Sequence, residues 1–340
     1  MTASTPKDPS AAPSARAPRA FPVRTEKVRC VVCGADEARP YRGGMYRIGA
    51  TSFDLVRCAC GMVYVNPSPD GPTLGAMYDD PDYYTHGYNL GVETENYFAR
   101  KDELLAHYDG VVAAYERETG LAKGALFELG SAGGFFLEAA RRRGWKVQGV
   151  ELSPPAAEYS IRELGLPVFR GLLEEAPFPP ASFDLALADN VLEHTTDPQR
   201  VLQKLRELLR PGGALIVICP SYVNSPYFRA MQLLQKLVPR ALLGPQTLKL
   251  LKFDGADNGY PYHILEFDLR ALRTLAERAG FTVERVERSV PLPAHLFKAR
   301  APTLAQRLQR AIFRTLYGGM RIGALPGARV RLVLRPAPGA

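Results

Sequence analysis

The stretch FELGSAGGFF, residues 127–136, joins a carboxylate to a glycine-rich turn and then to a run of apolar residues. A turn of this kind, between a buried strand and a helix, is typical of nucleotide-binding sites in alternating βα folds. A dinucleotide turn would have the spacing G-x-G-x-x-G, whereas Gly130, Ala132 and Gly134 recur here at every second position. Glu128 would repel a pyrophosphate and instead suits a ligand that carries a positive charge.

Short apolar runs alternate with helical patterns from about residue 121 onward. The expected strands cover residues 125–129, 146–151, 167–170, 183–189 and 214–219, and the expected helices cover 135–143, 154–164, 198–209 and 268–279. The segments RRRG, RPGG and ERAGF supply basic residues and glycines that suit helix C-termini. This alternation predicts an α/β fold with a parallel sheet flanked by helices, and a ligand beyond the carboxyl ends of the strands.

A second carboxylate, Glu151, ends the second expected strand, 21 residues after Gly130. An acidic side chain at this place can accept hydrogens from both hydroxyl groups of a ribose. Two carboxylates, a glycine turn and no phosphate cradle together predict a site for a nucleoside that bears a positive charge.

Four of the five cysteines lie near the N-terminus, as CVVCG (residues 30–34) and CACG (residues 58–61), with 24 residues between the pairs. In a reducing compartment this pattern favours a metal site over disulfides. Zinc prefers four tetrahedral thiolates, and the glycine after each pair allows a tight turn. We therefore expect a structural zinc site; free or oxidisable thiols are the alternative. Its ligands would be Cys30, Cys33, Cys58 and Cys60.

Residues from about 95 to 290 resemble a class I S-adenosylmethionine-dependent methyltransferase. The motifs that carry the resemblance are, in order, ELGSAGG, GVELSPPAAEYS, SFDLALADNVLEHTTDP and RELLRPGGALIVICPS. The resemblance implies a Rossmann-like class I methyltransferase sheet with helices on both faces, joined here to a small N-terminal zinc-binding module. The cysteine pairs, CGMVYVNPSPD and YDDPDYY add a resemblance to a family often tied to bacterial surface polysaccharide or secondary metabolite synthesis.

The resemblance also implies a pocket for S-adenosyl-L-methionine. Arg100 would meet the cofactor carboxylate, although a solvated helix arginine is an equal alternative. The other implied members are Glu128, Gly130 and Gly134 on the methionine side, Glu151 and Leu152 after the second strand, the backbone of Leu173 at the adenine, and Asp189 with Asn190 along the methionine.

Three positions depart from the family pattern. Ala132 replaces a glycine, which is tolerable only if its φ angle is not positive. Leu172 stands where many relatives carry an Asp that contacts the adenine amino group. Without that Asp, the backbone of Leu173 and apolar walls could hold the adenine, and Glu174 could take the place of the Asp. Asn190 stands where metal-dependent quinone-pathway methyltransferases, which this chain resembles at VLEH, place a second Glu, so we do not carry a catalytic metal over from that resemblance.

Methyl transfer to an alcohol is helped by a general base. His194 follows the fourth expected strand, and Glu193 could orient it; the alternative is that both residues cap the next helix or pin the loop. His263, in YPYHILEF, is a second candidate, whereas His86, His107 and His295 have no comparable context.

The expected organisation is a disordered tail (1–24), the zinc-binding module (25–70), linker and cap helices (71–120), the methyltransferase core (121–290) with an insertion (222–262), and a basic C-terminal extension with a helix and the last strand (291–340). The insertion carries aromatic residues that suit sugars or planar rings, although core packing is an alternative for several of them. They are Tyr222, Tyr227, Phe228, Phe253, Tyr260 and Tyr262.

Charge is unevenly distributed. The net charge is +8, yet residues 291–340 hold nine Lys or Arg and no acid, which leaves 34 basic and 35 acidic residues before them. A near-neutral body argues against a nucleic-acid partner, whereas the extension could contact an anionic membrane surface or substrate, or could be a solvated helix face. No run reaches the roughly 18 apolar residues of a membrane span and the first twenty residues lack a secretory signal, so we expect a cytoplasmic protein.

The leading prediction is a methyltransferase that acts on oxygen or carbon of a small hydroxylated acceptor, such as a sugar or a natural-product precursor. Two alternatives remain: an RNA methyltransferase with a zinc module, and a non-catalytic binding protein that kept the fold. The sequence leaves the acceptor and the oligomeric state open.

Overall fold

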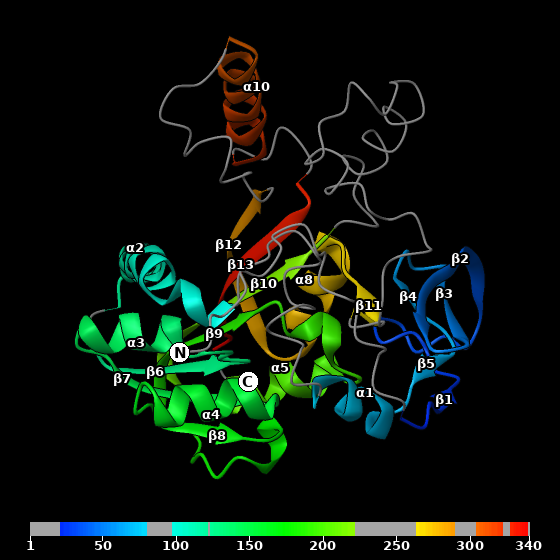
Figure 1. The fold of residues 1–340 in the computed structure, drawn as a ribbon, viewed down its shortest axis with the longest axis horizontal. Helices are drawn as coiled ribbons and strands as arrows, with labels where there is room; N and C mark the ends of the chain where they lie inside the picture. Colours follow the sequence, from blue (N-terminus) through cyan, green and yellow to red (C-terminus); the bar gives the residue numbers. More distant parts are fainter. Residues whose placement is uncertain are drawn as a thin grey trace, which may run out of the picture.

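The computed structural model describes residues 21–79, 97–121, 123–221, 263–289, 304–321 and 327–338 (Figure 1). Its centre is a seven-stranded sheet in the order β12-β13-β10-β9-β6-β7-β8. The five strands from β10 to β8 are parallel, and β13 runs antiparallel to both β10 and β12. The predicted α/β fold with a parallel sheet is therefore confirmed, with one antiparallel strand inside it.

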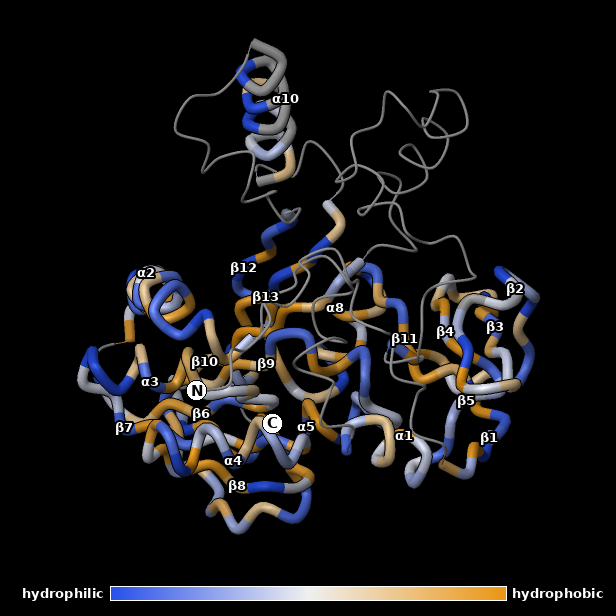
Figure 2. The backbone as a smooth tube through the Cα atoms, in the orientation of Figure 1, coloured by the Kyte–Doolittle hydropathy of each residue, from blue (hydrophilic) through white to orange (hydrophobic). Residues whose placement is uncertain are grey.

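The parallel strands lie close to their predicted positions, because each is an apolar run with turn residues at its ends. They are β6 (Ala125–Leu129), β7 (Lys146–Glu151), β8 (Val168–Arg170), β9 (Phe183–Asp189) and β10 (Leu209–Pro220). The antiparallel part consists of β12 (Phe281–Ser289), which the sequence analysis did not propose, and β13 (Arg329–Pro336), the predicted last strand. Figure 2 colours much of the central sheet as hydrophobic.

Helices cover both faces of the sheet, as predicted (Figure 1). One face packs against α2 (Lys101–Thr119), α3 (Phe135–Arg142) and α4 (Pro154–Arg162), and the other against α5 (Pro198–Leu208) and α8 (Leu269–Arg278). A hydrophobic core lies on each face of the sheet, and alternate residues of β9 belong to different cores. Leu185 and Leu187 pack on the side of α2, and Ala186 and Ala188 pack on the side of α5. Short 3-10 turns follow β8 and β9, namely η3 (Leu173–Glu175) and η4 (Leu192–His194), and a third, η2 (Tyr97–Arg100), leads directly into α2.

The N-terminal part forms a second sheet in the order β11-β4-β3-β2 and a pair β1-β5. Its own strands are β1 (Thr25–Glu26), β2 (Ala38–Ile48), β3 (Thr51–Cys58), β4 (Val63–Val65) and β5 (Ser68–Pro69), followed by α1 (Gly71–Tyr78). The strand β11 (Leu265–Glu266) comes from the core and pairs with β4. The module is therefore completed by a strand from outside it, and the two parts share one hydrophobic core.

The C-terminal extension contains α10 (Leu304–Arg321) and β13. Three of its basic residues form ion pairs with other parts of the chain: Arg329 with Asp189, Arg331 with Glu118 and Glu287, and Arg335 with Glu284. Part of the excess positive charge thus ties the last strand to the body.

The predicted aromatic insertion (222–262) and most of the predicted tail (1–24) lie outside the described residues. Within the described part of the chain, none of the helices combines the length and hydrophobicity needed to cross a bilayer.

Candidate methyl-donor and acceptor sites

The turn after β6 lies at the carboxyl edge of the sheet, where Gly130 and Gly134 have φ angles of 71° and 78°. A Cβ at Gly130 would lie 2.6 Å from Val191 Cγ2, and one at Gly134 would lie 2.5 Å from Leu166 Cδ1. Both positions therefore need glycine for conformation and for space. Gly134 also begins α3, so that this end of the helix faces the turn.

Ala132 has a φ angle of 47°. We expected this residue to avoid a positive φ, and that expectation is wrong. Two contacts hold the left-handed conformation: the Ala132 amide donates to Glu151 Oε2 at 2.7 Å, and the Ser160 hydroxyl donates to the Ala132 carbonyl at 2.9 Å. They offset a backbone strain of about 1–2 kcal/mol.

Glu151 is buried at the end of β7, with 5% of its surface exposed. Its Oε2 accepts from Ala132, and its Oε1 accepts from the Ser153 amide at 2.7 Å. Burial raises the pKa of this carboxyl, and the backbone amides oppose that shift. Each carboxylate oxygen has a second lone pair. The side chain can therefore hold the turn and still accept from the hydroxyls of a ribose.

Glu128 lies on β6, directly before the turn, and is 7% exposed. Its Oε2 has no hydrogen-bond partner among the described residues. Burial, and then the charges of Asp189 and Glu151, raise the pKa of this carboxyl well above its usual value. A cationic group beside it would satisfy the unpartnered oxygen and favour the ionised form. This buried acidic cluster fits the sulfonium and ammonium groups of S-adenosylmethionine.

The end of β9 supplies Asp189 and Asn190. Asp189 Oδ1 accepts from Arg329 Nη2 at 2.6 Å, and Asn190 has a φ angle of 54° while its amide donates to the Ile218 carbonyl at 2.9 Å. Arg100, at the start of α2, donates to Glu103 at 3.3 Å. The structure thus brings Asp189 and Arg329 together at the end of β9, where the methionine part of the cofactor is predicted.

Leu152 and Leu172, at the ends of β7 and β8, are 36% and 49% exposed, and are two of the three most exposed large apolar side chains among the described residues. Leu173 is 3% exposed and belongs to the core. Two solvent-facing leucines beside Glu151 provide apolar walls of the kind that suit an adenine ring. Glu174 is exposed, as part of η3.

Glu193, His194 and His263 form a cluster after β9. Their ligand-type atoms lie within 4.8 Å of one another, and the rings of His194 and His263 meet edge to face at 4.9 Å. Glu193 Oε1 lies 3.8 Å from His194 Nε2, which is longer than a hydrogen bond. Burial raises the pKa of Glu193 to about 8, and burial with the nearby His194 lowers the pKa of His263 to about 3. His263 is therefore held neutral, and His194, with 16% of its side chain exposed, is the imidazole of this cluster that another molecule can reach.

Comparison with known proteins adds to this geometry. Residues 127–217 match a family model described as a methyltransferase domain. This part of the chain is therefore similar to methyltransferase domains. The matched residues run from β6 through the glycine turn, Glu151 and the Glu193 loop to β10.

Among curated relatives, a ubiquinone biosynthesis O-methyltransferase from Cereibacter sphaeroides is 33% identical over 134 residues, covering 38% of this chain and 52% of that protein. An uncharacterized methyltransferase from a Mycobacterium species is 34% identical over 98 residues, covering 27% and 37%. The matches span about half the length of these relatives or less. Among solved structures, an S-adenosylmethionine-dependent methyltransferase from Mesorhizobium loti aligns over 62% of this chain and 90% of its own, with a TM-score of 0.39 and 19% identity.

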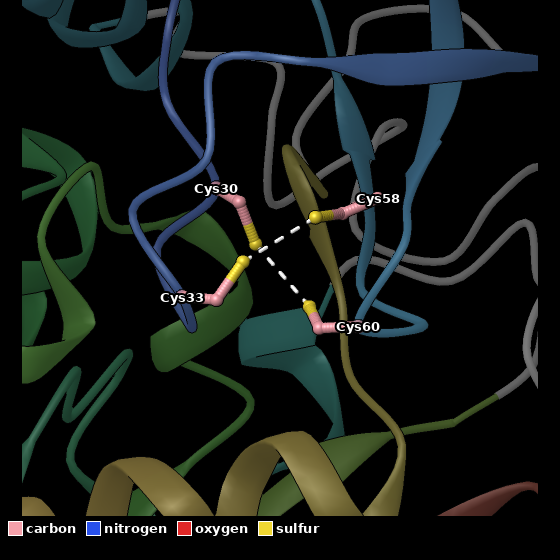
Figure 3. A group of neighbouring side chains, drawn as sticks. All are labelled: Cys30, Cys33, Cys58 and Cys60. Carbon is pink, nitrogen blue, oxygen red and sulfur yellow. Dashed lines mark hydrogen bonds between the residues drawn. The ribbon is translucent and has the colours of Figure 1, made fainter.

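Outside the matched residues, the four N-terminal cysteines lie close together, with their sulfurs within 4.8 Å of one another (Figure 3). The sulfurs of Cys30 and Cys60 are 3.6 Å apart, and those of Cys33 and Cys58 are 3.4 Å apart. Thiolates around a tetrahedral zinc lie about 3.8 Å apart, so the spacing suits that ion. Each pair closes a tight turn through its glycine, with Gly34 donating to the Cys30 carbonyl and Gly61 to the Cys58 carbonyl.

Sequence reasoning missed two features of these sites. The first is the ion pair between Arg329 and Asp189, which are 140 residues apart in the sequence. The sequence indicates it only through an arginine at the start of the predicted last strand. The second is the strand β11, which begins two residues after His263. The apolar residues Ile264 and Leu265 are a sign of a strand there, but the neighbouring sequence does not indicate that it pairs with β4.

Proposed function

We propose that the chain transfers the methyl group of S-adenosylmethionine to a small hydroxylated acceptor, such as a sugar or a natural-product precursor. The observation that carries the proposal is the buried carboxylate Glu128, whose Oε2 lacks a partner among the described residues, directly beside the left-handed glycine turn. A pyrophosphate would be repelled there, whereas the cationic groups of the methyl donor would be stabilised.

The roles of the residues follow from their chemistry. Glu128, Gly130, Ala132 and Gly134 form the methionine side of the pocket, and Glu151 holds the ribose. Leu152, Leu172 and the backbone of Leu173 contact the adenine, and Asp189 with Asn190 lines the methionine. The bound cofactor supplies an electrophilic methyl group, and the protein contributes alignment of the acceptor and exclusion of water.

Proton removal from the acceptor is assigned to the cluster after β9. His194 has 16% of its side chain exposed, while Glu193 is fully buried behind it. We propose His194 as the base and His263 as the group that fixes its ring. The name of the Cereibacter relative, an O-methyltransferase, favours oxygen as the methylated atom.

The four cysteines are proposed to bind a structural zinc ion. Four thiolates fill a tetrahedral coordination sphere and leave no position for substrate. The metal would therefore stabilise the module and take no part in methyl transfer.

Calorimetric titration with S-adenosylhomocysteine tests the first step, and product analysis after incubation with labelled methyl donor and cell extract tests the second. We expect one nucleoside bound per chain and label in a small molecule. Absence of binding by folded, zinc-loaded protein contradicts the proposal and favours a non-catalytic binding role. Label in RNA, together with RNA affinity that falls steeply with salt, contradicts the small acceptor.

A further inference from the structure

The helix α10 lies in the chain between the last two strands of the sheet, and this places it at the carboxyl edge of the parallel strands. The strand β12 ends at Ser289, which pairs with Arg329 at the start of β13, and Arg329 lies opposite Pro220 at the end of β10. Figure 1 shows α10 beyond these strand ends, apart from the other helices. The helix contacts β12, and Met320 in its last turn is buried. The fold therefore holds α10 at this edge.

The charge of α10 is of one sign. Its 18 residues include four arginines and no Asp or Glu. The arginines of β13 form ion pairs with acidic residues of the body, whereas α10 has no acid of its own. Helix positions three, four or seven residues apart lie on one side of a helix. The arginine positions of α10 therefore form one row along the helix; they are 307, 310, 314 and 321.

The side away from this row is apolar in sequence. Leucine or isoleucine recurs at every fourth residue, at positions 304, 308, 312 and 316. Ala311 and Thr315 are exposed, as are Arg307 and Arg314. Positions 304 and 308 precede Ala311 and Thr315 by seven residues, which is about two turns, so they lie on the same side of the helix as these exposed residues. The exposed part of α10 thus extends from the arginine row toward the side of the first apolar positions.

We propose that α10 binds an anionic lipid bilayer and lies in the plane of its surface. A bilayer surface offers negative phosphates to the arginine row and hydrocarbon to the apolar positions, so it is complementary to both sides of the helix. A nucleic acid would be complementary to the arginines alone. The helix would lie on the membrane without crossing it, since no helix in the described part of the chain is long and apolar enough to span one.

The position of α10 gives this binding a consequence for the sites. Because α10 is held beyond the ends of β12 and β13, a bilayer bound to it would lie on the side of the carboxyl edge, where the methyl donor and the acceptor are proposed to bind. This orientation favours an acceptor that is itself held at the bilayer surface. The binding does not depend on the proposed function.

Cosedimentation of the full chain with lipid vesicles tests the proposal. We expect the wild type to bind vesicles made of equal parts of phosphatidylglycerol and phosphatidylcholine, to release them as the salt concentration rises, and to leave vesicles of phosphatidylcholine alone unbound. Combined Arg307→Gln and Arg314→Gln should weaken binding to the anionic vesicles about thirtyfold, because two charges near the surface are removed. Combined Arg307→Lys and Arg314→Lys should bind as the wild type does, since a surface potential acts on charge and requires no guanidinium.

The matched control removes two exposed arginines from another helix, through Arg270→Gln and Arg273→Gln on α8, and should bind the anionic vesicles as the wild type does. An equal loss in the α8 and α10 variants would mean that net charge alone drives binding, and would overturn the role of α10. Wild-type protein that ignores anionic vesicles also overturns it, and binding of a DNA duplex in their place, lost in the α10 Gln variant, would identify a nucleic-acid surface. Lys variants as weak as the Gln variants contradict attraction by charge.

Nucleoside binding by the same proteins separates this inference from the proposed function. Wild-type protein that binds S-adenosylhomocysteine but no vesicles contradicts the membrane surface alone. Protein that binds anionic vesicles through α10 but no nucleoside contradicts the proposed function alone.

Discussion

Replacement of Glu151 by Gln tests the double role of this side chain. The carboxylate accepts two backbone hydrogen bonds of 2.7 Å, from Ala132 and from Ser153. Gln keeps one acceptor oxygen but turns an amide N–H₂ toward the other backbone donor. One hydrogen bond to a charged acceptor is lost, which costs about 1.5–3 kcal/mol, and a buried N–H is left without a partner.

We therefore expect Glu151→Gln to lower the free energy of unfolding by about 2–3 kcal/mol, read by urea denaturation. The same variant should bind S-adenosylhomocysteine about tenfold more weakly or worse, because it loses charge-assisted bonds to the ribose. The control is Glu138→Gln, since Glu138 is also buried and pairs with Arg141 and Arg142 on α3. It should lose stability and keep nucleoside affinity.

Two results would refute this reasoning separately. Unchanged stability of Glu151→Gln means that the carboxylate does not hold the left-handed Ala132. Unchanged nucleoside affinity means that the ribose is bound elsewhere, even if the protein is destabilised.

Three further changes test the remaining assignments. Cys33→Ser should release zinc, measured by metal analysis, and lower the melting temperature; a variant that retains one equivalent of zinc contradicts a four-thiolate site. His194→Ala should lose most of its turnover while S-adenosylhomocysteine affinity and zinc content stay unchanged. Intact turnover would leave His194 a structural role only. Loss of a second equivalent of metal would mean that His194 binds a metal ion and is not the proton acceptor. The pKa of Glu193 is raised to about 8, so the native state keeps a proton that the unfolded state releases above about pH 4.5. The free energy of unfolding should therefore fall between about pH 5 and pH 8, by up to about 1.4 kcal/mol per pH unit. Urea denaturation at several pH values should show a smaller pH dependence for Glu193→Gln than for the wild type. An equal pH dependence would show that Glu193 is ionised in the native state.

The sequence predicted the parallel half of the sheet because the central residues of most of those strands are buried and apolar. Strands β6, β7 and β9 begin and end where the apolar runs do. The strand β12 escaped prediction, since FTVERVERS mixes charged and apolar residues and has little buried surface. It lies at the end of the sheet and is fixed by pairing with β13, which is distant in sequence.

The conformation of the glycine turn was predicted where neighbouring residues determine it and missed where tertiary contacts do. Gly130 and Gly134 could be recognised from their spacing. The conformation of Ala132 could not, because it depends on Glu151 and Ser160, which lie on the next strand and helix. A positive φ angle is unfavourable for alanine considered alone, but the two hydrogen bonds from Glu151 and Ser160 offset this cost.

The N-terminal module and the cluster of Glu193, His194 and His263 are joined by the segment that follows His263. The Ile264 amide donates to the Glu193 carbonyl at 3.0 Å, and the Ile264 carbonyl accepts from the Val65 amide at 2.9 Å. Two residues later, Glu266 on β11 accepts a buried hydrogen bond from the Tyr46 hydroxyl at 3.3 Å. Backbone bonds thus hold His263 between the Glu193 loop and β4, the strand that follows the second cysteine pair. Because β11 completes the sheet of the module, we expect a stable module to be a condition for the ordered position of His263 beside His194.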